Sequence, residues 1–217
     1  MLLGKQFITD LLFGVQVVLA VIFGYSQVTH MLQNGADGVS IGMWTSFCLF
    51  AGLNLGLAIK ANKVYPDRNS QQNIFVYGLW VLIAALNATI ILVKSPGWDR
   101  TDTTVVILLL FGTLVIGFVA KKKHLNIRDP MIRGWLALLC KAMPQLAQAW
   151  KIVLNRGAPG FSPAMVWLGH ATILVRLAQL GFAVREAGWD KNRRASLLSE
   201  IGNELSWIIV TIIWLMY

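Results

Sequence analysis

Four ionisable residues lie within long apolar stretches of the sequence: Lys141, Arg176, Glu200 and Glu204. Charged side chains inside apolar segments that cross a membrane are rare, and they usually face a cavity or a partner of opposite charge. A helical rise of about 1.5 Å per residue places Lys141, Arg176 and Glu204 at a similar depth, about 12 Å from one end of their stretches. The spacing therefore predicts a buried cluster of two cations and two carboxylates.

Two interpretations of this cluster stay open. In the structural one, Arg176 forms a fixed ion pair with Glu204 or Glu200 that docks the helices. In the functional one, Arg176 binds the carboxylate of a solute through two parallel hydrogen bonds, and Glu204 or Glu200 carries a proton. Glu200, Asn203 and Glu204 are spaced i, i+3 and i+4, so they share one helix face. That face is expected to point into the protein, with Asn203 as a further substrate-binding candidate.

The charged residues belong to a strongly apolar chain. Of its 217 residues, 56% are apolar and 13% are charged, whereas soluble domains are about 25% charged. Runs of roughly 20 apolar residues are long enough to cross a bilayer as helices. Seven such runs are present, near 8–29, 40–60, 74–93, 104–120, 133–153, 163–184 and 196–216. The sequence predicts an all-α, multi-pass protein with seven transmembrane helices, in the plasma (inner) membrane if the source is bacterial.

The net charge of +9 reflects membrane orientation, and nucleic-acid binding is not expected. Thirteen of the 19 Lys and Arg residues lie at the N-terminus or in and beside the loops after the second, fourth and sixth runs. The opposite side carries four, counting Lys151 and Arg156 as loop residues. Excess positive charge marks the cytoplasmic side, so the charge bias predicts that the N-terminus is inside.

The chain contains an internal repeat. Gly35-Ala36-Asp37-Gly38-Val39-Ser40 matches Gly157-Ala158-Pro159-Gly160-Phe161-Ser162, 122 residues later. A polar break precedes each block, at Ser26-Gln27 and at Pro144-Gln145; pairing these glutamines requires a small insertion within 151–156. The repeat predicts three-helix units at 1–95 and 131–217, with 96–130 as a linker. The linker helix restores the orientation of the second unit, which gives two parallel bundles.

The second repeat resembles a known family. Pro144-Gln145, then Trp150, then Gly160-Phe161-Ser162 is similar to the motif of the PQ-loop, or SWEET-like (MtN3), membrane proteins; the first repeat departs from it at Ser26. The resemblance implies seven helices and transport, since members export sugars, cystine or cationic amino acids, although some relatives are receptors. It also implies an N-terminus outside, against the charge bias. The PnuC-type nicotinamide riboside transporters are a precedent for the reversed orientation.

The polar breaks are candidate hinges. A proline inside a helix removes one N–H donor and weakens the helix locally. Pro144 and Gln145, with Ser26 and Gln27 in the first repeat, therefore form the predicted hinge or gate; a static kink at Pro144 is the alternative. Gln16 and Gln27 are three helical turns apart, so their shared face is expected to be interior.

Further solute-binding candidates come from the repeat and the resemblance. The 122-residue offset pairs Asn54 with Arg176. The SWEET resemblance implies a substrate-binding asparagine on the third helix of each unit, for which Asn87 and Asn203 are the candidates. Trp80 lies two turns before Asn87 and either stacks on the solute or packs in the core. Asp37 fits a turn or helix cap, while proton-coupled relatives suggest a proton role.

These patterns favour a secondary transporter or facilitator for a small polar solute, with an amino acid or related zwitterion or anion favoured and proton coupling as a hypothesis. The alternatives are a SWEET-type sugar uniporter and a ligand-binding receptor or adaptor without transport. No catalytic, metal-binding or cofactor-binding motif is found, so neither enzyme activity nor a cofactor is expected. The predicted partners are the solute, H⁺ and the lipid bilayer, and homo-oligomer formation is left open.

Overall fold

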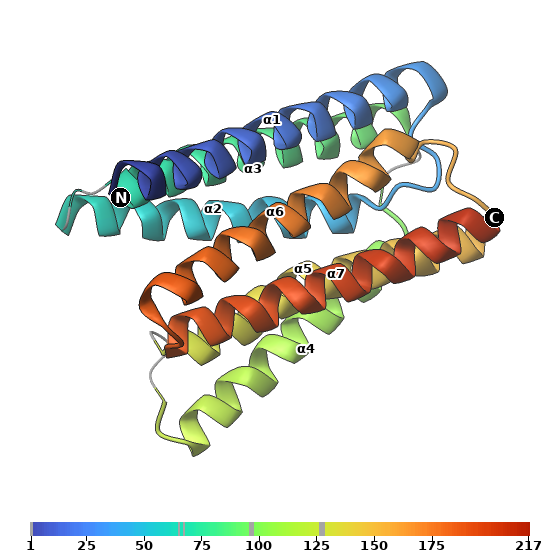
Figure 1. The fold of residues 1–217 in the computed structure, drawn as a ribbon. Coiled ribbons are helices and arrows are strands. Elements are labelled where there is room, and N and C mark those ends of the chain that lie inside the picture. Colours follow the sequence, from blue (N-terminus) through green and yellow to red (C-terminus); the bar gives the residue numbers. More distant parts are fainter. Residues whose placement is uncertain (1, 65, 67, 96–97, 126–128) are drawn as a thin grey trace.

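Seven long helices run side by side between two ends of the molecule (Figure 1). The computed structural model describes residues 2–64, 66, 68–95, 98–125 and 129–217. Its helices are α1 (Leu2–Asn34), α2 (Ile41–Val64), α3 (Arg68–Lys94), α4 (Arg100–Lys122), α5 (Pro130–Asn155), α6 (Pro163–Ala187) and α7 (Lys191–Met216). The part of the chain that is described is all-α, as the sequence predicts. The two termini lie at opposite ends of the molecule (Figure 1).

Local sequence signals set the starts of the last four helices. The side chains of Asp99, Asp129, Ser162 and Asp190 each accept a hydrogen bond from a backbone N–H of the first helical turn. Such caps satisfy N–H groups that have no partner within the helix. Proline follows the cap in α5 and α6, where its missing N–H carries no cost.

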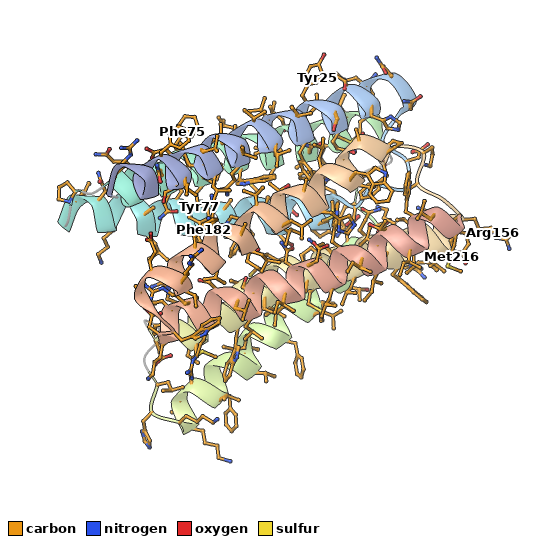
Figure 2. All side chains as sticks on the ribbon, viewed as in Figure 1. Tyr25, Phe75, Tyr77, Arg156, Phe182 and Met216 are labelled. Atoms are coloured by element: carbon orange, nitrogen blue, oxygen red, sulfur yellow. The ribbon has the colours of Figure 1, made fainter. Side chains whose placement is uncertain are left out.

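Six of the helices are long and apolar enough to cross a membrane, namely all except α5. The sequence prediction of a span at 133–153 is therefore not matched by the composition of α5, which carries Arg133, Lys141 and Lys151. Large apolar side chains cover the outside of the molecule, and Figure 2 shows Tyr25 and Phe75 pointing away from the helices. Such a surface suits contact with lipid. The six helices support a multi-pass integral membrane protein.

The helix contacts have an approximate twofold pattern. Helix α3 packs against α1 and α2, and α7 packs against α5 and α6. The two sets meet where α1 contacts α6 and α2 contacts α5. Exchanging α1, α2 and α3 with α5, α6 and α7 reproduces these contacts. Among the described helices, α4 packs against α2 and α5 alone.

The loops at 35–40 and 157–162, here called the glycine loops, lie directly against each other. The N–H of Gly160 donates to the carbonyl oxygen of Asp37 at 3.1 Å. A Cβ atom added to Gly38 would lie 2.6 Å from the Cα of Ala158, and one added to Gly160 would lie 2.8 Å from the Cα of Ala36. Only glycine permits this approach, which explains Gly38 and Gly160; Gly35 and Gly157 instead have positive φ, of 83° and 142°.

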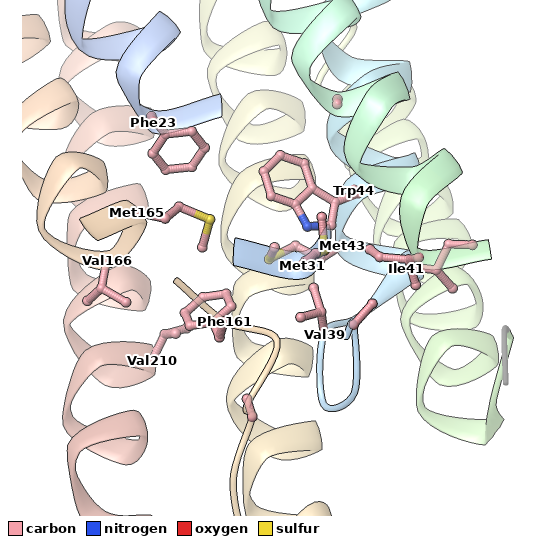
Figure 3. Close-up of a cluster of buried hydrophobic side chains, with 14 of the residues drawn as sticks. Phe23, Met31, Val39, Ile41, Met43, Trp44, Phe161, Met165, Val166 and Val210 are labelled. Carbon is pink, nitrogen blue, oxygen red and sulfur yellow. The ribbon is translucent and has the colours of Figure 1, made fainter. Parts of the chain in front are cut away.

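A cluster of buried apolar side chains lies beside the glycine loops (Figure 3). Val39 and Phe161 extend into it from the two loops, and Trp44 of α2 and Val166 of α6 join it. Each of these four side chains is at most 2% exposed. The cluster therefore packs α1–α3 against α5–α7 at this end of the molecule.

Replacing Gly160 with alanine should destabilise the protein, because the new methyl group would meet the backbone of residues 35 and 36. We expect a loss of about 1–3 kcal/mol, as for other overpacked sites. Gly181→Ala on α6 is the control, because a Cβ there meets nothing within 4 Å. Thermal unfolding in detergent should show a lower midpoint for Gly160→Ala only. Equal midpoints for the two variants would contradict the close approach of the loops.

Candidate functional site

A buried glutamine from the first half of the chain binds the glycine loop of the second half. The Nε2 of Gln27, on α1, donates to the carbonyl oxygen of Gly160 at 2.8 Å. Its Oε1 accepts from the N–H of Ser162 at 2.8 Å. Gln27 is fully buried, so its amide satisfies two backbone groups that water does not reach.

Gln148, on α5, makes the reciprocal pair with the first glycine loop. Its Nε2 donates to the carbonyl oxygen of Gly38 at 2.7 Å, and its Oε1 accepts from the N–H of Ser40 at 2.6 Å. Gln148 is also fully buried. The two glutamines, here called the crossed glutamines, thus join each half of the chain to the other.

The structure corrects the repeat alignment. Gln27 corresponds to Gln148, 121 residues later, and its predicted pairing with Gln145 is wrong. Because the glycine loops are 122 residues apart, the second repeat is longer by one residue, not by several. That residue is Arg156, which ends α5 in the left-handed conformation with φ of 53°. A single residue in the left-handed conformation is a common way to end a helix.

A buried carboxylate ties the start of α4 to the same end of the molecule. Asp102 is fully buried, and its Oδ1 accepts from the hydroxyl of Ser40 at 2.6 Å and from the N–H of Gly42 at 2.8 Å. The Nζ of Lys151 lies 3.2 Å from its Oδ2 and 2.8 Å from the Oδ2 of Asp99. Lys151 is therefore a buried residue of α5, and its assignment to a loop in the charge count is wrong.

Asp99 titrates at a lower pH than an ordinary aspartate. Burial raises its pKa. The hydrogen bond from Lys151, the hydrogen bond from the N–H of Asp102 and the positive charge of Lys151 lower the pKa by more than burial raises it. The net result is a pKa below the ordinary value of 3.8. The carboxyl group of Asp99 is therefore ionised at neutral pH.

A cavity of about 140 Å³ lies between the two sets of helices. Its lining residues come from α1, α2, α3, α5, α6 and α7, and none of the described residues that line it belongs to α4. Phe23, Trp44 and Trp207 belong both to the lining and to the buried cluster. Gln16 and Arg176, further along their helices from the glycine loops, line it too. The cluster therefore separates the cavity from the glycine loops.

One wall of the cavity carries three of the four predicted buried charges. The Nζ of Lys141 lies 2.8 Å from the Oε1 of Glu200, and the Nε of Arg176 lies 3.9 Å from the same oxygen. The side chains of Lys141 and Glu200 are 12% and 10% exposed, whereas that of Arg176 is 37% exposed. Lys141 is thus the structural partner of Glu200, and Arg176 is the more accessible cation.

Polar residues of α5 and α7 continue this wall. The Nε2 of Gln145 donates to the Oδ1 of Asn203 at 2.7 Å, and Ser206 donates to the Oε1 of Gln145. Helix α5 continues through Pro144, which is buried beside them. Six of the predicted site residues line the cavity: Trp80, Pro144, Gln145, Arg176, Glu200 and Asn203. Gln16 lines it as well and is buried, as its predicted interior face requires.

Asn54 and Asn87 lie elsewhere. Asn54 donates to the carbonyl oxygen of Phe50 at 2.8 Å, and the buried Asn87 donates to that of Ile83 at 2.8 Å. Neither is among the described residues that line the cavity. The structure therefore does not bring them together with the other predicted solute-binding residues.

Three further candidates also lie outside the cavity. Ser26 donates to the carbonyl oxygen of Phe23 at 2.9 Å, which is a local contact within α1. Gln27 binds the second glycine loop, as described above. Asp37 is exposed in the first glycine loop, as its turn interpretation predicts.

Glu204 is paired with His170 rather than with Arg176. Its Oε1 lies 2.6 Å from the Nδ1 of His170, and the Nε2 of His170 lies 2.9 Å from the hydroxyl of Thr211. That hydroxyl donates to the carbonyl oxygen of Trp207, so its oxygen accepts a hydrogen bond from the N–H at Nε2. The other ring nitrogen, Nδ1, is left to form the hydrogen bond with Glu204.

The sequence reasoning missed the aromatic side of the cavity. Phe23, Phe47, Phe50 and Tyr77 line it together with Trp80. Phe47 and Phe50 are three residues apart on α2, which is the spacing of one helix face. In an apolar chain that signal does not distinguish a cavity wall from ordinary core packing.

No model of a known protein family matches this sequence, and a search of curated proteins finds no match. The similarity to PQ-loop proteins therefore stays an expectation based on the motif residues.

Replacing Lys151 with methionine should strongly destabilise the protein, because the buried carboxylate of Asp102 would lose its cation. Breaking a buried ion pair on one side costs about 3–5 kcal/mol. Lys94→Met is the control, since Lys94 is exposed near the end of α3. Thermal unfolding at pH 7 should separate the two variants by many degrees. A Lys151→Met midpoint within a degree of the control would contradict the role of Lys151 at Asp102.

Proposed function

We propose that the protein is a secondary transporter or facilitator that moves a small polar solute across a membrane, with amino acids and related zwitterions or anions favoured. The observation that carries the proposal is the cavity between the two sets of helices, with an accessible arginine in its wall. Sites between helix repeats are a common plan among secondary transporters.

The proposed architecture consists of two parallel three-helix bundles, α1–α3 and α5–α7, joined by α4, with units at 1–95, 96–130 and 131–217. The twofold contact pattern and the crossed glutamines support it. Helix α5 is the seventh crossing in this arrangement. Among the described helices it alone has no stretch apolar enough to count as a span by composition, but it contacts α2, α4 and α7, and its Lys141 and Lys151 have carboxylate partners.

The conformation described here corresponds to one end state of transport. The buried cluster and the crossed glutamines close the route between the cavity and the glycine loops. With the N-terminus inside, as the charge bias favours, this closed side faces outward. Passage of a solute requires the crossed glutamines to release the opposite loops. Pro144, at the cavity wall of α5, is the candidate hinge for that movement.

Proton coupling is the second part of the proposal. The Oε1 of Glu204, on α7, lies 2.6 Å from the Nδ1 of His170, on α6, and His170 lies one residue from Gly169 of the cavity lining. A pair of this kind holds or releases a proton as its surroundings change, so it is a candidate coupling site. Glu200 is a weaker candidate because Lys141 holds it in an ion pair.

Transport should be measured as uptake into liposomes that contain the purified protein, with pooled labelled amino acids and sugars. We expect saturable uptake of at least one pool. Arg176→Gln should reduce the uptake at least tenfold if the solute carries a carboxylate, because the charged hydrogen bonds are lost. Arg185→Gln, an exposed position on the same helix, should behave like the unmodified protein. Absence of flux, together with thermal stabilisation by a solute, would favour a receptor.

An inward proton gradient should accelerate the uptake, and Glu204→Gln should remove this acceleration. The same variant should keep uptake driven by the solute gradient alone, because Glu204 is not part of the cavity lining. The measurement is the ratio of initial rates with and without the gradient. An unchanged ratio in Glu204→Gln would exclude that residue as the coupling site.

A further inference from the structure

The two walls of the cavity differ in chemistry. Helices α1–α3 supply six aromatic residues, namely Phe23, Trp44, Phe47, Phe50, Tyr77 and Trp80. The ring centroid of Trp80 lies 5.3 Å from that of Phe23 and 5.2 Å from that of Phe47, both edge to face. Such contacts fix the orientation of the rings. This wall therefore offers a preformed surface for a flat apolar group.

The wall from α5–α7 carries an excess positive charge. Among the described residues that line the cavity, two cations, Lys141 and Arg176, face a single carboxylate, Glu200. Glu204 is outside the lining and is held by His170. Lys141 is committed to Glu200 at 2.8 Å, but Arg176 is 3.9 Å from that oxygen.

Arg176 has hydrogen-bonding capacity to spare. In the part of the chain that is described, its guanidinium donates only from Nη1, to the Oε1 of Gln179 at 3.1 Å. A guanidinium carries five N–H donors and binds carboxylates through two of them at once. The accessible group on this wall is therefore suited to a ligand carboxylate.

We propose that the cavity selects small organic anions in which a flat aromatic ring is joined to a carboxylate by a short linker. The carboxylate would bind Arg176, and the ring would lie on the wall around Trp80. A sugar carries no charge to match the excess cation, and a cationic solute would be repelled by it. The volume of about 140 Å³ is close to the roughly 150 Å³ that holds benzene in another protein, so it fits the ring, and the linker would extend toward the 37% exposed side chain of Arg176.

Three matched probes test this selectivity by calorimetric titration of the purified full-length protein in detergent. They are 3-phenylpropionate, 3-cyclohexylpropionate and 3-phenylpropanamide. We expect 3-phenylpropionate to bind about 3- to 10-fold more tightly than the cyclohexyl acid, and at least about tenfold more tightly than the amide. Partition into detergent favours the more apolar cyclohexyl ring, so it cannot produce this order.

Variants assign the two preferences to the two walls. Arg176→Gln should remove the preference for the acid over the amide, and Trp80→Leu should remove the preference for phenyl over cyclohexyl. Trp80→Phe keeps a ring in place and should keep the preference, which covers the case in which Trp80→Leu fails to fold. The controls, Arg185→Gln and Trp150→Leu, change exposed residues and should change neither preference.

The inference rests on the proposed function only in treating the cavity as a solute site, and the two can fail separately. Equal binding of the three probes, or tighter binding of the cyclohexyl acid, would overturn the inference. Selective binding without flux in liposomes would leave the inference standing and overturn the transport proposal. Saturable flux of aliphatic or uncharged solutes, with no preference among the probes, would support the transport proposal and overturn the inference.

Discussion

The whole arrangement depends on two side-chain amides that replace the missing secondary structure of the glycine loops. Each loop leaves backbone groups unpaired in a region without water, where one such group costs about 1–3 kcal/mol. A glutamine amide has one acceptor next to its donors, so it pairs with both the C=O and the N–H of a short peptide segment. Gln27 and Gln148 do this for the opposite loops. These four backbone groups find their partners in the other half of the chain, so each half requires the other.

A symmetric scaffold carries an asymmetric cavity. The corrected repeat alignment pairs Lys141 with Ala20 and Arg176 with Asn54, so the charges exist in the second half only. Most aromatic residues of the lining belong to the first half. Phe23 corresponds to Pro144 in the second half, and Phe47 corresponds to Gly169. The residues that hold the halves together are matched between the repeats, whereas those that face the cavity are not. Divergence at the lining is what allows one face to hold a charge and the other a ring.

Much of this could be predicted from the sequence, but not the partners of the charges. Apolar runs and repeated glycines indicate the helices and the repeat, since both follow from local composition. The depth argument correctly grouped Lys141 with Arg176, because rise per residue is fixed, but it placed Glu204 at their level, whereas the structure brings Glu200 to them. It could not tell that Lys141, not Arg176, holds Glu200, or that His170 holds Glu204, since these contacts depend on helix rotation. The Pro-Gln motif predicts Gln145 as the counterpart of Gln27. One extra residue, Arg156, makes Gln148 the counterpart instead, and it binds the first glycine loop as Gln27 binds the second.

The positions of the carboxylate partners along the chain also bear on the synthesis of the protein. Asp102 precedes Lys151, so this lysine has its partner as soon as α5 leaves the ribosome. Glu200 follows Lys141 by 59 residues, so Lys141 has no partner until α7 is made. A lysine at the centre of a membrane helix costs about 2.5–3.5 kcal/mol on insertion scales. In the proposed arrangement with α5 as a crossing, α5 would therefore wait at the protein-conducting channel, or slip partly out of the bilayer, until α7 is made. The order of translation would then make α7 the helix that completes the insertion of α5.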